Sequence, residues 1–335
     1  MATRLAWLFL LPSNMQPKPL AQNNVIGIVA PAGKIKSDSL NKAISVLESW
    51  GLRVQSGNHI FSDNHSYFSG SDDERWQDFQ QMLDDPKLKA IICARGGYGT
   101  TRIIDRLDFT SFLKYPKWIV GFSDVTALHL KLHQLGIESI HSVMPIQFPK
   151  PEHEESIESL RRILFGEVGL IQAKASELNR LGSASGQAIG GNLSLLVDSL
   201  GTSTEVDTIG KILVIEEVGE YRYKLDRMFT QLKRARKLDH LAGLIIGHMT
   251  DIQDTEISFG QTVEEIILEK VKDNSYPVAF NFPIGHDAPN LAWRHGAKAI
   301  LFVTRNKSRL KIEPLSQSLN SFTVGSNRGS DEKVI

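Results

Sequence analysis

A short apolar run that breaks at a glycine and leads straight into a helical pattern constrains this chain more than any other feature. Residues 118–120 (Trp-Ile-Val) have the length and apolar character of a buried strand, and Gly121 ends the run. Apolar residues then recur with helical spacing from Val125 to about Leu135. A short apolar strand joined to a helix by a tight turn is typical of sheets built from parallel strands. The turn itself holds Ser123 and Asp124.

The same alternation of strand and helix patterns continues through most of the chain. It predicts an α/β fold with a mostly parallel sheet that carries helices on both faces. The predicted strands are 25–30, 52–54, 89–94, 118–120, 211–216, 241–246, 278–280 and 297–304. The predicted helices are 37–50, 72–83, 125–135, 154–164, 193–200, 225–236 and 262–271.

A chain of 335 residues is long enough for two domains, and its character changes near the middle. Pro149 and Pro151 bracket a charged stretch, and several glycines follow one predicted helix. We therefore expect an N-terminal extension over 1–22, a first domain over 23–150, a connection over 151–185, a smaller C-terminal α/β domain over 186–315 and a tail over 316–335.

Composition excludes several classes of partner. The 38 basic and 38 acidic side chains cancel, which points neither to nucleic acid nor to a membrane surface. Cys93 is the single cysteine, and no Cys/His cluster has zinc spacing, so we expect a reducing compartment, no metal and no cofactor. The apolar stretch 1–12 is at the minimum length for a signal-peptide core, and Met15 is an alternative start.

Ser123 admits two interpretations. At the end of a strand and the start of a helix, its hydroxyl would lie exposed above the positive end of the helix dipole, as a nucleophilic serine does. Ser and Asp are also favoured N-caps of any helix. The stretch lacks the second glycine of the G-x-S-x-G motif, so it is not an ordinary α/β-hydrolase elbow.

A glycine-rich loop follows the strand predicted at 89–94. Gly96 and Gly97 let the backbone turn with its N–H groups free to face an anion, either a phosphate or the oxyanion of a tetrahedral intermediate. Neither G-x-G-x-x-G nor a P-loop is present, and a simple tight turn explains the glycines equally well.

Two further places could supply proton-transfer chemistry. His286 stands on a predicted loop between Gly285 and Asp287, where an imidazole is well placed to move protons. Glu216 and Glu217 end an apolar strand, and one of them could orient a histidine. Neighbours in a strand point to opposite faces, but both faces are apolar here, so periodicity does not choose between them.

Together these motifs resemble the LD-carboxypeptidase family, which includes the murein tetrapeptide carboxypeptidases and the microcin C immunity peptidases. The resemblance spans roughly residues 24 to 313. The motifs are Ile-Val-Ala-Pro-Ala-Gly (28–33), Ala-Arg-Gly-Gly-Tyr-Gly (94–99), Gly-Phe-Ser-Asp-Val-Thr (121–126), Gly-Gly-Asn-Leu-Ser (190–194), Ile-Glu-Glu-Val (215–218), Leu-Asp-Arg-Met (225–228) and Gly-His-Asp (285–287).

The resemblance implies a serine peptidase with a Rossmann-like N-terminal domain and a triad that spans both domains. It implies that Ser123 is the nucleophile, His286 the general base and Glu216 the acid that orients it. The implied oxyanion hole consists of the backbone N–H groups of Asp124 and of Gly97, with Gly96 as the alternative to Gly97.

The resemblance also implies a substrate and a setting. We expect a cytoplasmic, homodimeric carboxypeptidase that releases terminal D-Ala from murein tetrapeptides in cell-wall recycling. The segments 221–227 and 292–296 depart from the family pattern and leave the exact peptide open. A peptidase or amidase that acts on peptidyl-nucleotides, and a non-catalytic nucleotide- or peptide-binding protein, are the alternatives. The expected substrate contacts are Arg95, Gly96, Tyr98 and Asn192.

Overall fold

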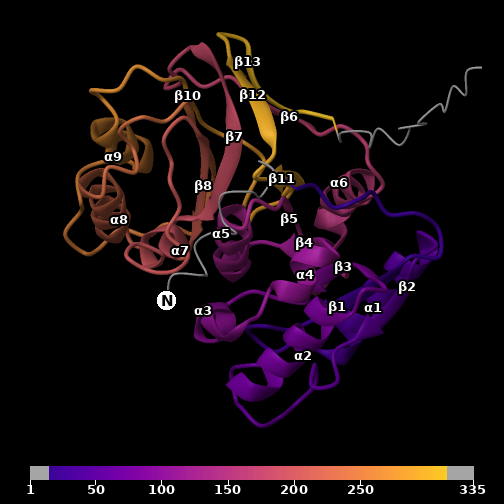
Figure 1. Ribbon diagram of the computed structural model, residues 1–335. Coiled ribbons are helices and arrows are strands. Elements are labelled where there is room, and N and C mark those ends of the chain that lie inside the picture. The colour runs from indigo at the N-terminus through magenta and orange to yellow at the C-terminus, as the bar shows by residue number, and fades with distance from the viewer. Residues whose placement is uncertain (1–14, 315–335) are drawn as a thin grey trace, which may run out of the picture.

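The computed structural model describes residues 15–314, which form two sheets with helices packed on them (Figure 1). The predicted α/β class is confirmed. The possible signal segment at 1–12 and the predicted tail over 316–335 lie outside the described residues. None of the helices within 15–314 is long and apolar enough to cross a membrane.

The first sheet has the strand order β11-β5-β4-β3-β1-β2. All of its strands run parallel except β11, which pairs antiparallel with β5. The chain passes from β1 to β2 on one side and returns to β3 on the other, so a crevice opens between the carboxyl ends of β1 and β3. The strands are β1 (Val25–Val29), β2 (Arg53–Ser56), β3 (Leu88–Cys93), β4 (Trp118–Gly121), β5 (Ser139–His141) and β11 (Trp293–His295).

Alternate residues of the central strands enter two separate cores. Ile26 and Ile28 of β1 join the core under α1 and α6, whereas Val29 joins the core under α2 and α5. Burial on both faces explains why these strands read as continuous apolar runs. The helices of this half are α1 (Ser37–Ser49), α2 (Asp72–Asp84), α3 (Thr100–Ile103), α4 (Thr110–Lys114), α5 (Thr126–Gln134) and α6 (Glu154–Leu164).

The second sheet is half parallel and half antiparallel, with the order β10-β9-β8-β7-β12-β13-β6. From β7 to β10 neighbouring strands are parallel, and from β7 to β6 they are antiparallel. The strands are β6 (Leu170–Lys174), β7 (Gly182–Asn192), β8 (Ile212–Val218), β9 (Gly243–Thr250), β10 (Val278–Ala279), β12 (Lys298–Val303) and β13 (Lys307–Ile312). Helices α7 (Leu193–Asp198), α8 (Arg222–Arg234) and α9 (Val263–Lys270) share one core with the parallel part. The segment expected as a connection thus contributes α6 and β6.

The two halves meet where α5 lies against β7 (Figure 1). Gly191 has a φ of 135°, and a Cβ there would lie 2.5 Å from Oγ1 of Thr126. That hydroxyl oxygen accepts a hydrogen bond from the backbone N–H of Asn192 (3.1 Å). The missing side chain at position 191 therefore lets α5 and β7 approach closely enough to bond.

Three buried histidines fill the junction beside this contact. The rings of His129 and His295 stack with their centroids 5.5 Å apart, and His141 stacks on Trp293 at 5.3 Å. Burial lowers the pKa of His129 to about 4 and holds the pKa values of His141 and His295 well below their ordinary range. All three rings are thus neutral at neutral pH and pack as aromatic core residues.

We predict that Gly191→Ala destabilises the protein more than Gly201→Ala does. Both glycines have positive φ, at 135° and 77°, but a Cβ at position 201 meets no atom within 4 Å. The two substitutions share a backbone penalty of about 1–3 kcal/mol, and the crowding against Thr126 adds about 1–3 kcal/mol at position 191 only. Urea unfolding midpoints of both variants measure the difference. Equal midpoints would show that α5 can move away from β7 without a loss of stability.

Candidate active site

The turn after β4 holds Ser123 in a strained backbone conformation. A Cβ at position 121 would lie 2.9 Å from the side chain of Val125, so glycine is required at the bend. Ser123 has a φ of 63°, a left-handed conformation that is found at nucleophiles on sharp strand-to-helix turns. A short 3-10 turn over Ser123–Val125 then leads into α5. The hydroxyl is thus presented at the carboxyl end of the first sheet.

Ser123, His286 and Glu216 form one chain of contacts across the two sheets. Nε2 of His286 lies 3.1 Å from Oγ of Ser123, and Nδ1 of the same ring lies 2.7 Å from Oε2 of Glu216. Ser123 follows β4 of the first sheet, Glu216 belongs to β8 of the second, and His286 stands on the loop after β10. Within the described residues no side chain caps the 3-10 turn or α5, so the cap interpretation of Ser123 has no support.

Burial and charge act in opposite directions on His286. Burial alone would lower the pKa of the imidazole, but the adjacent Glu216 carboxylate outweighs it, with help from Glu217 and Asp287, and the pKa is raised. Glu216 is fully buried, so water does not screen its charge. A hydroxyl, an imidazole and a buried carboxylate in this order can activate an oxygen nucleophile.

The glycine-rich loop after β3 lies directly beside Ser123. A Cβ at position 96 would lie 3.1 Å from Cβ and 3.2 Å from Oγ of Ser123. Gly97 and Gly99 have φ values of 106° and 141°, which other residues rarely adopt. The loop from β1 supports this one, because the N–H of Gly33 donates to the carbonyl of Gly96 (3.2 Å). Both loops lie at the crevice between β1 and β3.

Two buried charged side chains hold the glycine-rich loop in place. The Arg75 guanidinium donates to the carbonyls of Pro31 and Gly99, and so ties the loops after β1 and β3 together. The Asp124 carboxylate is 1% exposed and accepts the N–H of Thr100 at 2.8 Å. The side chain of Asp124 is therefore structural and points away from the space beside Ser123.

Comparison with known proteins identifies the family. Residues 26–142 match the LD-carboxypeptidase N-terminal domain, and residues 185–301 match the LD-carboxypeptidase C-terminal domain. The chain belongs to the LD-carboxypeptidase family.

Two relatives that are named as murein peptide carboxypeptidases support this assignment. A probable murein peptide carboxypeptidase of Bacillus subtilis is 35% identical over 293 residues, which cover 86% of this chain and 92% of that protein. The murein tetrapeptide carboxypeptidase of Pseudomonas aeruginosa is 30% identical over 290 residues, covering 82% and 92%.

Solved structures share the fold. The muramoyltetrapeptide carboxypeptidase from Oxalobacter formigenes superposes with a TM-score of 0.80 at 27% identity, covering 88% of this chain and all of that one. The microcin C7 self-immunity protein, at 22% identity, has a TM-score of 0.79 and covers 91% of this chain and all of its own, which shows a common fold.

Arg95 and Tyr98, two of the expected substrate contacts, are exposed at the crevice. Nη1 of Arg95 donates to the carbonyl of Lys34 (2.8 Å), which leaves the rest of an exposed guanidinium at the mouth. The ring of Tyr98 is 49% exposed and packs at a tilt against Phe68, with centroids 5.7 Å apart. Gly96 lies between them and Ser123, as described above.

Asn192 and Glu217 form a separate buried network. The side chain of Asn192 is occupied, because Nδ2 donates to Oε1 of Glu217 at 2.7 Å and Oδ1 caps α7 through the N–H of Leu195. Oε2 of Glu217 accepts both the N–H and the hydroxyl of Ser194. Glu216 and Glu217 thus point to opposite faces of β8, and Glu216 alone of the two bonds to His286.

Tyr67 is a residue of the site that the sequence did not reveal. Its hydroxyl lies 2.9 Å from the position that a Cβ on Gly97 would occupy, so it faces the glycine-rich loop. It comes from the long irregular segment between β2 and α2, where no periodicity or motif marks it. Among the described residues no group of three or more His, Cys, Asp or Glu side chains could hold a metal ion.

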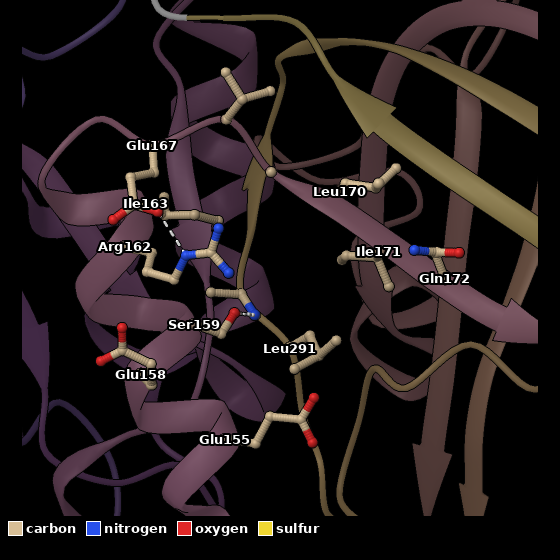
Figure 2. Close-up of a pocket in the computed structure, with 13 residues that line it drawn as sticks. Glu155, Glu158, Ser159, Arg162, Ile163, Glu167, Leu170, Ile171, Gln172 and Leu291 are labelled. Carbon is tan, nitrogen blue, oxygen red and sulfur yellow. Dashed lines mark hydrogen bonds and ion pairs between the residues drawn. The ribbon is translucent and has the colours of Figure 1, made fainter.

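Helix α6 anchors the loop that carries His286. Oγ of Ser156 accepts the N–H of Asn290 at 2.9 Å, and Oδ1 of Asn290 accepts the N–H of Gly285 at 3.1 Å. One turn further along the helix, Oγ of Ser159 accepts the N–H of Ala292 (Figure 2). The serine face of α6 therefore fixes both sides of the loop after β10.

A cavity of about 380 Å³ opens beside this anchor, between α6 and the start of β6 (Figure 2). Its lining mixes charged side chains of α6 with apolar side chains of β6 and Leu291, and it includes neither Ser123 nor its two partners. This cavity is distinct from the crevice where the three side chains meet.

We predict that His286 titrates above the ordinary histidine pKa of about 6.5 and that Glu216→Gln lowers its pKa. Burial still disfavours the imidazolium in the variant, while the neighbouring charge that raises the pKa is gone. A ¹⁵N-edited NMR titration of both proteins measures the two values. An unchanged pKa would show that Glu216 does not set the charge of the ring.

Proposed function

We propose that this chain is a serine-type LD-carboxypeptidase that releases terminal D-Ala from murein tetrapeptides. The observation that carries the proposal is the continuous contact from Ser123 through His286 to Glu216, in a chain whose relatives are named murein peptide carboxypeptidases. We further propose that it works in the cytoplasm, in cell-wall recycling, as a homodimer. The single cysteine and the family resemblance support these settings.

The proposed reaction begins with Ser123. Oγ attacks the carbonyl carbon of the bond between the third residue and D-Ala, while Nε2 of His286 removes the hydroxyl proton. The tetrahedral intermediate collapses to an acyl-enzyme as His286 returns the proton to the departing amine of D-Ala. Water, deprotonated by the same imidazole, then attacks the acyl-enzyme. The second tetrahedral intermediate expels Oγ of Ser123, which takes that proton from the imidazolium, and the shortened peptide leaves as a carboxylate. Throughout, Glu216 fixes the tautomer of His286 and balances the imidazolium charge.

The oxyanion is proposed to lie between the two loops at the end of β3 and β4. The backbone N–H groups of Gly97 and Asp124 are the proposed donors, and the bare Cα of Gly96 leaves the space beside Oγ open to a carbonyl. One such donor contributes about 10²–10³ in rate when it is pre-positioned. The bonds from Arg75 and from the Asp124 carboxylate support that pre-positioning.

Cleavage of one terminal residue also requires a group that binds a free carboxylate. Arg95 is the proposed partner, because a guanidinium can form two parallel hydrogen bonds to a carboxylate and this one is exposed beside the crevice. Tyr98 and Tyr67 flank the same loop and are proposed to line the D-Ala pocket. For Asn192 the hydrogen bonds to Glu217 and α7 favour a structural role near the site.

A peptidyl-nucleotide is the second candidate substrate, and one surface feature favours it. Tyr221 and Tyr223 are both 37% exposed, with stacked rings 5.9 Å apart, just beyond the carboxyl end of β8. Exposed aromatic faces can stack on a nucleobase. The fold is shared with the microcin C7 self-immunity protein.

One assay separates these functions. The protein is incubated in parallel with murein tetrapeptide and with a hydrolysable peptidyl-adenylate analogue, and the products are followed by mass spectrometry. If the chain is an LD-carboxypeptidase, we expect tripeptide and free D-Ala from the murein tetrapeptide. Cleavage of the analogue alone would assign the second function, and nucleotide retention without cleavage of either would indicate a binding protein.

We predict that Ser123→Ala removes D-Ala release and keeps the fold. The side chain lies in a half-buried turn, whereas the attacking oxygen is indispensable, so turnover falls by about 10⁶. Discontinuous assays of D-Ala release measure the turnover, and a thermal melt of the same sample measures the stability of the fold. Activity within tenfold of the unmodified protein would eliminate the proposed nucleophile.

Glu216→Gln and Glu217→Gln form a matched pair of neighbouring substitutions. We predict that Glu216→Gln lowers turnover by about 10⁴, because the amide no longer stabilises the imidazolium or its correct tautomer. Glu217→Gln alters the network under α7 and lowers turnover only mildly. Turnover numbers with saturating tetrapeptide make the comparison, and reversed severities would reassign the acid to Glu217.

A further inference from the structure

Two buried polar atoms near His286 have no hydrogen-bond partner among the described residues. One is Oε1 of Glu216, the carboxylate oxygen that does not bond to His286, and the other is Nδ1 of His248 in β9. One atom is an acceptor, and the other is a donor in the Nδ1–H tautomer of a neutral imidazole. A buried polar atom left unpaired is costly, so a complementary pair in one place calls for an explanation.

An irregularity in the sheet brings these two residues to the same face. Ile215 of β8 pairs with Ile246 of β9, but Glu217 pairs with Met249, so two residues of β9 oppose Glu216 alone. This is a β-bulge, which re-aims side chains and is frequent beside active sites. In a regular ladder Glu217 would oppose His248, and the bulge places His248 opposite Glu216 instead.

The neighbouring glycine shows how close the two side chains lie. A Cβ on Gly285 would be 3.0 Å from Cβ of Glu216 and 3.0 Å from Cβ of His248, so both side chains border the same space beside Gly285. The bulge also holds the loop, because the N–H of His248 donates to the carbonyl of Ile284 at 2.7 Å. His248 is thus fixed beside Glu216 by its own backbone and lies two residues from His286 through that bond.

We propose that His248 is a positioning residue for Glu216, and that its Nδ1–H donates to Oε1 of Glu216 through one bridging water. The inference rests on the proposed function, since it extends the contact chain to Ser123–His286–Glu216–His248. With both oxygens of the carboxylate bonded, Oε2 stays directed at Nδ1 of His286. Without His248 the carboxylate can rotate about its last bond and lose that direction.

The charges around His248 agree with a neutral donor. Burial lowers its pKa, while Asp287 and Glu216 act to raise the pKa and His286 acts to lower it. The ring also borders a cavity of about 370 Å³ whose other polar lining includes Glu264, Asn281 and Asp287. A ring that is neutral at neutral pH has one N–H, and the buried Nδ1 of His248 has no other partner among the described residues.

The experiment compares two substitutions of His248 in the full-length protein. His248→Phe keeps a ring of similar volume without a donor, and His248→Asn places an amide N–H close to the position of Nδ1. We expect kcat for D-Ala release to fall about 10- to 100-fold in His248→Phe, with KM within about twofold, and to be restored to within about threefold in His248→Asn. His240→Phe, on the exposed residue shortly before β9, is the matched control and retains full activity.

The pH profile separates positioning from a packing defect. A carboxylate that is no longer directed at His286 raises the pKa of the imidazole less, so the acid limb of kcat/KM should move down by about half a pH unit in His248→Phe and not in His248→Asn. Two-bond ¹⁵N–¹H spectra of the unsubstituted protein give an independent measurement, in which we expect His248 to carry its proton on Nδ1.

Several results would overturn the inference. They are an Nε2–H tautomer for His248, full activity in His248→Phe, or equal losses in both variants with an unmoved pH limb. If the unsubstituted protein releases no D-Ala, the proposed function fails instead, and the tautomer measurement still decides whether His248 bonds to Glu216.

Discussion

The close approach of the two sheets is the constraint on which the site depends, because Ser123 belongs to one sheet and Glu216 to the other. A single hydrogen bond links them almost directly. Thr126, three residues after Ser123, accepts the N–H of Asn192, and Asn192 is the ladder partner of Glu216 across β7 and β8. The bare Cα of Gly191 makes that bond possible. The position of the hydroxyl relative to the carboxylate is therefore set by the close contact of β7 with the short, branched side chain of Thr126.

The loop that carries His286 completes the arrangement from a third direction. It is tied to α6 through Ser156 and Asn290, and to the bulge of β9 through Ile284. A catalytic imidazole on a loop needs such ties, because a displacement of about 1 Å can remove most of the benefit of orientation. The loop is irregular in outline but anchored to rigid elements on two sides.

The elements with strong periodicity could be predicted from the sequence, and the polar or very short ones could not. The helix predicted over 154–164 is α6, and the central apolar strands fall where they were expected. Strands β5 and β11 have three residues each, too few for a pattern. In β13 the basic residues Lys307, Arg309 and Lys311 alternate with buried residues, and in β6 the buried Ile171 and Ala173 alternate with exposed residues. Strands of this alternating kind have no continuous apolar run to mark them in the sequence.

The residues of the candidate site also differ in how far the sequence alone predicts them. Ser123 stands out in sequence because the strand, the glycine and the helix around it are all local features. The choice between Glu216 and Glu217 needed the tertiary structure, since both faces of β8 are apolar and only the position of the loop after β10 distinguishes them. His248 was invisible to periodicity for a further reason, because a bulge changes the face on which a residue lies without leaving any mark in the sequence.

The histidines of the junction and of the site place the same requirement on pH, although their pKa values shift in opposite directions. His129 keeps a pKa of about 4 when folded, so below about 6.5 the unfolded chain binds the additional proton and stability falls as the pH drops. His286 has a raised pKa, so its own contribution to stability is greatest at low pH and is lost as the pH rises through that value. The pKa values of His141 and His295 are lowered like that of His129, so these two rings also destabilise the folded protein as the pH drops. The combined effect of the three buried rings exceeds the opposite effect of His286. As a base, His286 must also be unprotonated. The neutral junction and the free base therefore both require a pH above the ordinary histidine range, and the fold and the chemistry are compatible in the same interval.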